Sequence, residues 1–171
     1  MTGRLLAPIV VTGLMGGEDF AWLDRQRRAY YPPDRNVLPA HLTLFRHLPP
    51  STLGEVAVRI KTLCASPPPK ASLAGVLLLE HGVAYRVESP ALMDIWLELA
   101  DAFSSLLVPQ DLARPRLHVT VQNKVTAKEA RALAGRLKAG FRPRPLAITG
   151  LAVWHYRGGP WELAARSCFR G

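Results

Sequence analysis

Two short segments of this chain each place a histidine two positions before a threonine, inside an apolar run. The first segment, HLTLF, contains His41 and Thr43, and the second, HVTVQ, contains His118 and Thr120. Alternate residues of a β-strand face opposite sides, so each histidine is expected to share a face with its threonine. Each segment therefore predicts a strand with an apolar back and a front that carries an imidazole and a hydroxyl.

These residue types can perform acid–base chemistry on a phosphodiester. An unperturbed imidazole titrates at about pH 6.5, so one histidine can be neutral and accept a proton while another is protonated and donates one. In-line displacement requires such a base and acid on opposite sides of the phosphorus atom. The threonine hydroxyls can donate hydrogen bonds to the non-bridging oxygens as negative charge develops there. The candidates are His41 and His118 for proton transfer, and Thr43 and Thr120 for binding the phosphate.

The prediction depends on the two motifs being present together. Threonine is common in strands, and one His-x-Thr segment alone is most simply an ordinary structural strand. Two copies inside matching apolar frames are harder to explain in that way. No acidic cluster of the kind that binds magnesium accompanies them, and a zinc ion bound by His41 and His118 would lack an evident third ligand. We expect no metal and no cofactor.

Three further residues extend the predicted front faces. Phe45 lies beyond Thr43, where its ring could stack on a nucleobase. Gln122 and Lys124 lie beyond Thr120, where either could contact a phosphate or the edge of a base. Packing between lobes explains Phe45 at least as well, and a solvated strand end explains the other two. All three are candidate substrate-binding residues with both interpretations open.

The rest of the chain alternates between predicted strands and helices, and each motif strand has a helix before and after it. This order indicates two similar lobes, each with one motif, within a single α+β domain over residues 1–171. Antiparallel-rich sheets with helices outside them are the expected architecture. Strands are predicted over 7–14, 41–48, 70–80, 83–89 and 116–125, helices over 18–32, 51–66, 90–107 and 126–140, and a closing hairpin over 145–169.

The composition indicates a basic globular protein. Lysine and arginine total 22 against 13 acidic residues, and the formal charge of +9 attracts anions such as nucleotides or RNA, or simply aids solubility. No segment approaches the roughly 20 apolar residues that a membrane-spanning helix needs, so no membrane association is expected. Cys64 and Cys168 show no metal-binding spacing, and we expect both to be buried, reduced thiols of a cytoplasmic protein. We expect a monomer.

The paired motifs HLTL and HVTV resemble those of the 2H phosphoesterases, the superfamily of LigT-like 2'-5' RNA ligases and cyclic phosphodiesterases. The resemblance implies a bilobal fold with pseudo-twofold symmetry and a central cleft. It implies that His41 and His118 are the catalytic pair and that Thr43 and Thr120 bind the phosphate. The implied substrates are RNA ends or nucleotides that carry a 2',3'-cyclic phosphate or a 2'-5' phosphodiester, opened without a metal. The likeness extends over 27–45, 115–125 and 152–169.

Two other classes of function stay open at this point. The chain could be a non-catalytic RNA- or nucleotide-binding module that keeps the same cleft, or a structural protein in which both motifs are packed inside. Two intact motifs favour an enzyme, because binding alone does not require two titratable imidazoles. Which histidine acts as the base depends on which oxygen leaves, and the sequence does not decide it.

Overall fold

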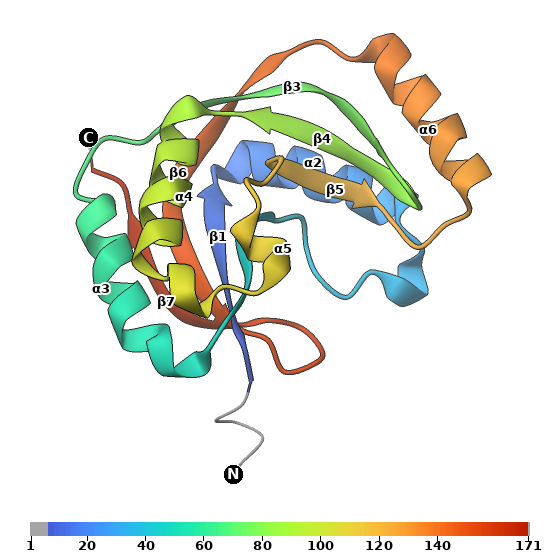
Figure 1. Cartoon of the computed structure of the whole chain (residues 1–171). Helices are drawn as coiled ribbons and strands as arrows, with labels where there is room; N and C mark the ends of the chain where they lie inside the picture. Colours follow the sequence, from blue (N-terminus) through green and yellow to red (C-terminus); the bar gives the residue numbers. More distant parts are fainter. Residues whose placement is uncertain (1–6, 171) are drawn as a thin grey trace.

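Seven antiparallel strands form one sheet in this computed structural model, which describes residues 7–170. The strand order is β2-β1-β6-β3-β4-β5, and β7 pairs with β6. Residues 1–6 and 171 of the expected domain lie outside the described part. The strands are β1 (Ile9–Met15), β2 (Leu42–Leu48), β3 (Lys70–Leu79), β4 (Gly82–Glu88), β5 (His118–Gln122), β6 (Arg144–His155) and β7 (Glu162–Cys168) (Figure 1).

The helices alternate with the strands in the predicted order, which confirms the α+β architecture. The predicted helix over 90–107 differs most, because it ends at Ala102 and a separate 3-10 turn follows. The helices are α2 (Gly17–Tyr30), α3 (Leu53–Leu63), α4 (Pro90–Ala102), α5 (Pro109–Leu112) and α6 (Ala127–Gly140), and the 3-10 turns are η1 (Pro33–Arg35), η2 (Pro50–Thr52) and η3 (Ser104–Leu106).

Strand β6 joins the two halves of the sheet. Its first residues, 144–147, pair with β3, and its later residues, 148–155, pair with β1. Strand β7 pairs with the same later part. One half therefore contains β2, β1, β7 and the end of β6, and the other contains β5, β4, β3 and the start of β6. The two antiparallel sheets that the sequence indicates are continuous through this one strand of 12 residues.

The two motif strands, β2 and β5, stand at opposite ends of the strand order and nevertheless contact each other. Neighbouring strands in a sheet are rotated relative to one another, and over several strands this rotation curls the sheet. Figure 1 shows the curvature in β3 and β4, which arch above β1. The curl brings β2 and β5, the two edge strands of the sheet, next to each other. The two motifs, one from each half, therefore lie on either side of the contact between β2 and β5.

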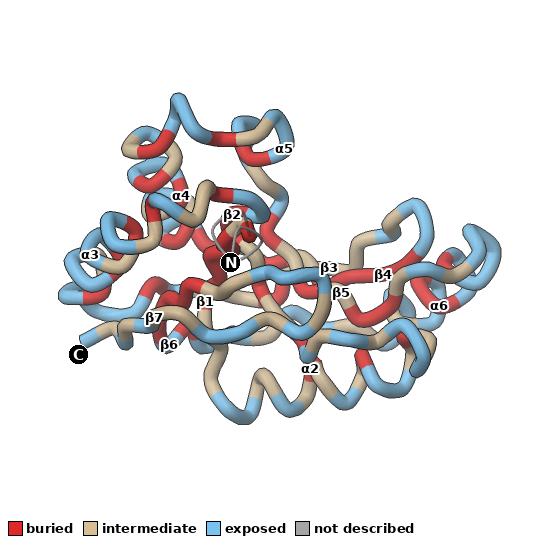
Figure 2. The backbone as a smooth tube through the Cα atoms, turned by 90° about the horizontal axis from the view of Figure 1, so that it is seen from below, coloured by how far each residue is buried: buried red, intermediate tan, exposed pale blue. Residues whose placement is uncertain are grey.

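Helices cover the sheet from both sides. Figure 2 shows α2 on one side and α3, α4 and α5 on the other. Helix α2 packs on β5, α6 on β3 and β4, α3 on β7, and α4 on β3. The apolar backs of the motif strands enter the core between these layers. The largest fully buried side chains include Ile9, Leu23, Leu42, Phe45, Leu48, Ile60, Leu73, Leu92, Leu133, Ile148 and Leu151.

Two expectations drawn from composition can be compared with the structure. No helix within residues 7–170 is long and apolar enough to cross a membrane.

Cys64 is buried, and its thiol donates to the carbonyl oxygen of Ser167 at 3.4 Å. Burial raises the pKa of this thiol to about 11. Cys168 is exposed, so the expectation of burial is wrong for this residue. It is the last residue of β7, which within residues 7–170 pairs with β6 alone.

Strand β2 carries an extra residue between Phe45 and Leu48, where it bulges away from regular pairing with β1. The main-chain N–H groups of Arg46 and His47 in this bulge donate to the carboxylate of Asp111 at 2.9 to 3.0 Å. Asp111 is 4% exposed and lies in α5, in the segment that leads to the second motif. Its carboxylate therefore connects the strand of the first motif to the approach of the second.

We expect Asp111→Ala to lower the free energy of unfolding by about 3 kcal/mol, because two main-chain N–H groups lose a charged, buried acceptor. Urea denaturation followed by circular dichroism measures this loss. Asp111→Asn keeps one acceptor oxygen, so its free energy of unfolding should fall by less than that of Asp111→Ala. The control is Asp101→Ala, which removes an exposed carboxylate on α4 and should change stability by no more than about 0.5 kcal/mol. An equal loss at both positions would contradict the bridging role.

Candidate active site

Each candidate catalytic histidine stands where a motif strand begins. His118 is the first residue of β5, and His41 directly precedes β2. The Nδ1–H of His41 donates to the carbonyl oxygen of Pro39 at 2.8 Å, and the Nδ1–H of His118 donates to that of Arg116 at 2.6 Å. A carbonyl can only accept, so the proton of each neutral imidazole is on Nδ1 and the lone pair is on Nε2. The two rings are therefore held as the same tautomer.

The predicted alternation of faces holds from each histidine to its threonine. Leu42 and Val119, between the histidine and the threonine of each motif, are fully buried. Thr43 and Thr120 are only partly buried, as are both histidines. Each motif therefore presents one imidazole and one hydroxyl on the side that faces away from the core.

Both motif strands bulge immediately after the threonine. The pairing of β2 with β1 skips Leu44, and the pairing of β5 with β4 skips Val121. A bulge places two residues of one strand opposite one residue of its partner, which disturbs the alternation of side chains. The carbonyl of Leu44 accepts a hydrogen bond from Nε1 of Trp96 at 3.1 Å. The front face predicted from the sequence therefore ends at the threonine in both motifs.

The bulge in β2 moves Phe45 into the core. Phe45 is 1% exposed, and its ring stacks on Trp96 with centroids 5.6 Å apart and planes 7° apart. The ring has no open face for a nucleobase. The predicted stacking role of Phe45 is therefore wrong, and packing explains this residue.

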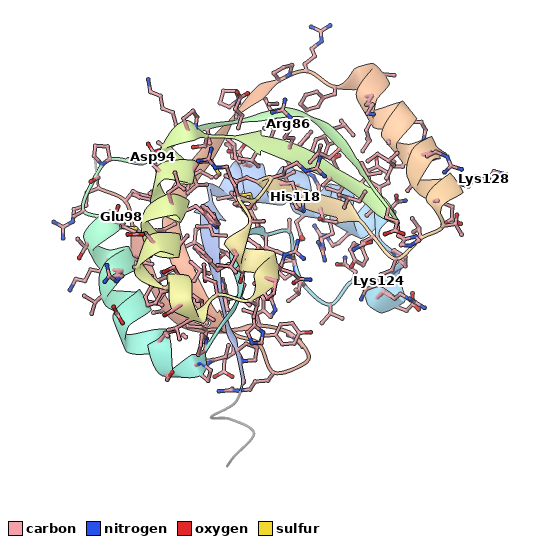
Figure 3. All side chains as sticks on the ribbon, viewed as in Figure 1. Arg86, Asp94, Glu98, His118, Lys124 and Lys128 are labelled. Atoms are coloured by element: carbon pink, nitrogen blue, oxygen red, sulfur yellow. The ribbon has the colours of Figure 1, made fainter. Side chains whose placement is uncertain are left out.

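Gln122 and Lys124 are not brought to the motif residues either. Gln122 follows the bulge in β5 and is 7% exposed, and its Oε1 is buried with no hydrogen-bond partner in the described chain. Lys124 lies beyond the end of β5 with an exposed side chain and a left-handed φ of 61°. Figure 3 shows Lys124 at the opposite end of β5 from His118. The Gln122 side chain therefore has little surface open to a substrate, and Lys124 lies far from His118 along β5.

Burial and neighbouring cations lower the pKa of both histidines. Burial takes water from the charged form of His41, and its pKa falls to about 4 although the Nδ1 hydrogen bond opposes this. The charges of Arg27, His118 and Arg46 lower it further. The pKa of His118 is also lowered, by burial first and then by Arg46 and Arg116. Both imidazoles are therefore neutral at pH 7, and they are close enough for one charge to affect the other.

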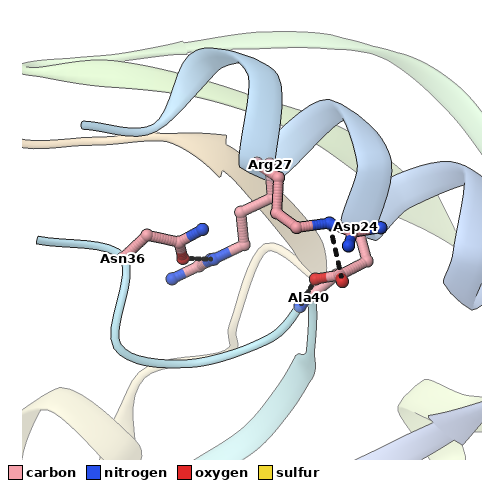
Figure 4. Close-up of polar contacts among 5 residues, drawn as sticks. Asp24, Arg27, Asn36 and Ala40 are labelled. Atoms are coloured by element: carbon pink, nitrogen blue, oxygen red, sulfur yellow. Dashed lines mark hydrogen bonds and ion pairs between the residues drawn. The ribbon is translucent and has the colours of Figure 1, made fainter. Parts of the chain in front are cut away.

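Arg27 is a buried cation that the sequence presents as an ordinary helix residue. It is 4% exposed on α2, and its Nη1 donates to the main-chain oxygen of Thr120 at 3.1 Å. Its Nε donates to Oδ1 of Asn36 at 2.8 Å (Figure 4), and its guanidinium lies 4.3 Å from the centroid of the Tyr31 ring. Arg27 therefore links α2 to the second motif strand and to the segment before the first motif. Its only signal in the sequence is a helical spacing shared with apolar residues.

Asp24, one turn before Arg27 on the same helix, secures the approach to the first motif. Its Oδ1 accepts a hydrogen bond from the main-chain N–H of Ala40 at 2.9 Å, and its other oxygen pairs with Arg28 at 3.5 Å (Figure 4). Ala40 is the residue directly before His41. Helix α2 thus positions main-chain atoms of both motif segments.

Two more arginines lie beside the histidines. Arg46 lowers the pKa of both His41 and His118, so its charge is near each imidazole. Arg86 of β4 pairs in register with His118 (Figure 3), and residues directly opposite in an antiparallel pair share a face of the sheet. The sequence alone does not distinguish either arginine from a solvated strand residue. Arg46 places positive charge near both imidazoles, whereas the Arg86 guanidinium lies 4.0 Å from the carboxylate of Glu88 and is not among the charges that lower either histidine pKa.

The hairpin between β6 and β7 covers His41. The rings of Trp161 and His41 have centroids 4.7 Å apart and planes at 59°. Trp154 lies 6.4 Å from Trp161, and its Nε1 donates to Oγ1 of Thr12 at 2.8 Å. Nε1 of Trp161 is buried and has no partner within residues 7–170. Trp161 is therefore part of the burial of His41 and has an unused donor beside it.

The side chains where β2 meets β5 could transfer two protons at one phosphate. Two imidazoles have free Nε2 atoms, two hydroxyls share their faces, and arginines supply positive charge. Among residues 7–170, no group of three or more histidine, cysteine, aspartate or glutamate side chains is arranged to hold a metal ion.

Fold and site together define a bilobal α+β protein with one His-x-Thr strand from each half. A family model described as the 2'-5' RNA ligase superfamily matches residues 17–160. The chain belongs to the 2'-5' RNA ligase superfamily, and the resemblance to the 2H phosphoesterases is confirmed. None of the curated proteins compared matches this chain.

Solved structures share the fold over nearly the whole chain. TT0787 of Thermus thermophilus is 16% identical, with a TM-score of 0.65 and coverage of 96% of this chain and 98% of that one. LigT of E. coli, solved with 3'-AMP, is 14% identical, with a TM-score of 0.61 and coverage of 96% and 99%. At these identities the likeness shows the fold alone.

We expect Trp161→Ala to raise the pKa of His41 from about 4 towards 6.5, because water then reaches an imidazole whose burial is the largest cause of its shift. NMR titration of the histidine C–H resonances measures this change. Trp161→Phe keeps a ring over the imidazole and should keep the pKa low. An unchanged pKa in Trp161→Ala would show that the hairpin does not control the protonation of His41.

Proposed function

We propose that this protein is a metal-independent phosphodiesterase that opens a 2',3'-cyclic phosphate, or a related 2'-5' phosphodiester, at an RNA end or on a nucleotide. The observation that carries the proposal is the matched pair of imidazoles, each held by its Nδ1–H so that Nε2 is free. The superfamily is named for a 2'-5' RNA ligase, and LigT of E. coli is complexed with 3'-AMP in a solved structure. A nucleoside 3'-phosphate is one product that opening of a 2',3'-cyclic phosphate gives.

The proposed step is displacement at phosphorus by water. One Nε2 accepts a proton from the water as the water oxygen bonds to phosphorus. The bond from phosphorus to one ribose oxygen breaks, and the Nε2–H of the other histidine gives its proton to that oxygen. The product is a phosphate monoester beside a free ribose hydroxyl. One proton enters the histidine pair and one leaves it, so the total is conserved.

We assign His41 as the base and His118 as the acid for hydrolysis. The pKa of His41 is about 4, and the charge of Arg27 opposes its protonation. Arg27 is not among the charges that lower the pKa of His118. A bound phosphodiester is an anion and raises the pKa of an imidazole close to it. Binding of the substrate thus favours protonation of His118 before it donates.

The remaining polar groups act on the non-bridging oxygens. The hydroxyls of Thr43 and Thr120 share the histidine faces and donate hydrogen bonds as negative charge develops. Arg46 is near both imidazoles and offers the opposite charge. A guanidinium has several donors in a planar fork, which suits it to two oxygens of one phosphate.

We expect His41→Ala and His118→Ala each to lower kcat/KM for a 2',3'-cyclic nucleotide by about 10²- to 10⁴-fold, the usual contribution of a positioned acid or base. Wild-type activity should persist in EDTA. Chromatography of the monoester product measures both results. His81→Ala is the control, because His81 is exposed at the turn between β3 and β4 and its loss should leave the rate unchanged.

Loss of activity on chelation, or full activity in both histidine variants, would refute the two-histidine mechanism. Binding without turnover, across cyclic phosphates and 2'-5' oligonucleotides, would instead support a non-catalytic binding module.

The two roles can be separated with a nucleoside 4-nitrophenyl phosphodiester, whose leaving group departs without a proton. We expect His118→Ala to recover most of its activity on this substrate, because the missing acid is no longer needed. His41→Ala should stay inactive, since water still has to lose a proton. Release of 4-nitrophenolate measures both rates. The opposite pattern would exchange the assigned roles.

A further inference from the structure

A groove of about 750 Å³ lies between α2 and α6, within the size range of ligand-binding pockets. One wall is a stripe of α2 that includes Trp22, Arg25 and Gln26, at helical spacing. The other wall is the last turn of α6 and the segment that follows it, and Tyr85 of β4 lies between the walls. Figure 2 shows α2 and α6 beside the half of the sheet that contains β3, β4 and β5.

This groove is distinct from the histidine site. Tyr85 pairs in register with Val119, and Arg86 pairs with His118. Adjacent residues of a strand face opposite sides, so Tyr85 lies on the reverse face of the sheet from His118. Neither histidine and neither threonine of the motifs lines the groove.

The groove is strongly basic. Four arginines line it and no acidic residue does. Arg144 pairs with Asp19 at 3.2 Å and lies 4.3 Å from the centroid of the Trp22 ring. Arg25, Arg136 and Arg142 are exposed and form no ion pair within residues 7–170. Three guanidinium groups therefore face one hollow without an internal counter-charge.

A buried donor in the wall lacks an acceptor. The hydroxyl of Tyr85 donates to Oε1 of Gln26, which orients the amide, and Nε2 of the same amide is buried with no partner in the described chain. Buried polar groups are nearly always hydrogen-bonded, and an unmet donor is costly. Gln26 lines the groove, and a small movement of its amide would let this donor reach an oxygen of a ligand there.

Aromatic rings accompany the cations. The ring of Tyr85 lies between those of Trp22 and Phe141, with centroid distances of 5.3 and 5.8 Å. Phe141 is only partly buried. Aromatic rings beside arginines are what proteins use to hold unpaired bases and the phosphates between them.

We propose that this groove binds a short stretch of single-stranded RNA. The free arginines contact its phosphates, a base stacks on Phe141 or on the guanidinium plane of Arg144, and Gln26 donates to an RNA oxygen. The choice of RNA over other polyanions rests on the proposed function. The groove adds binding affinity for an RNA chain. A mononucleotide bound at the histidines does not gain this affinity.

The test is fluorescence anisotropy with a labelled eight-nucleotide oligoadenylate that ends in a 3'-hydroxyl. We expect Arg136→Ala with Arg142→Ala to weaken binding at least tenfold. Loss of two phosphate contacts should reduce the slope of log Kd against log salt by about 1.4. Phe141→Leu should weaken binding several-fold with the slope unchanged, because it removes stacking and no charge.

The control pair is Arg131→Ala with Arg166→Ala, which removes the same charge from exposed positions outside the groove. Equal weakening by the two pairs would overturn the proposal, since only net charge would then matter. Competition by an oligoglutamate peptide as effective as by unlabelled RNA would also overturn it, in favour of an acidic-peptide site.

The outcome is separable from that of the proposed reaction. The oligonucleotide carries no cyclic phosphate, so its binding does not require turnover. His118→Ala should bind it as the wild type does, and the groove pair should keep full activity on a 2',3'-cyclic mononucleotide. Binding that persists in a protein with no phosphodiesterase activity would support the groove and refute the reaction.

Discussion

The candidate active site depends on one hydrogen bond that the chain makes twice, from a histidine Nδ1–H to the carbonyl two residues earlier. Each bond fixes the tautomer and so decides which nitrogen can exchange a proton. The accepting carbonyls lie in segments that other elements hold. Asp24 binds the main-chain N–H of Ala40 beside the first, and the N–H of Val87 donates to the carbonyl of Leu117 beside the second, at 2.8 Å. Each accepting carbonyl therefore lies next to a main-chain group that another element holds by a hydrogen bond.

The two halves of the protein share main-chain geometry more than they share side chains. Each motif strand is an edge strand, pairs regularly as far as its threonine and then bulges. The residues after the two bulges differ in kind. Phe45 packs on Trp96, whereas Gln122 is buried with an unpaired oxygen. A repeated backbone with different side chains explains how the motifs match while the sequence around them has diverged.

Periodicity in the sequence predicted the order of strands and helices, and the spacing of the motifs predicted which four side chains share two faces. The alternation rule failed for Phe45 and Gln122 because a bulge depends on the partner strand, which local sequence does not reveal. The burial of Arg27 could not be predicted from the sequence either. Its position in the helical pattern is that of an apolar residue, but its charge favours solvent. Its contacts with Asn36 and Thr120, far apart in the chain, and with the ring of Tyr31 account for its burial.

Neutral histidines among arginines form a site suited to an anion. Burial disfavours a charged imidazole, and the guanidinium groups of Arg27 and Arg46 disfavour it further at His41. In the proposed reaction, a phosphodiester between the strands would offset the guanidinium charges and, against the effect of burial, raise the pKa of the imidazole that acts as the acid. In that reaction, binding of the anion and uptake of a proton by the imidazole would be coupled. The lowered pKa of His118 in the free protein is consequently compatible with its proposed role as the acid, since the negative charge of the substrate would favour the protonated imidazole.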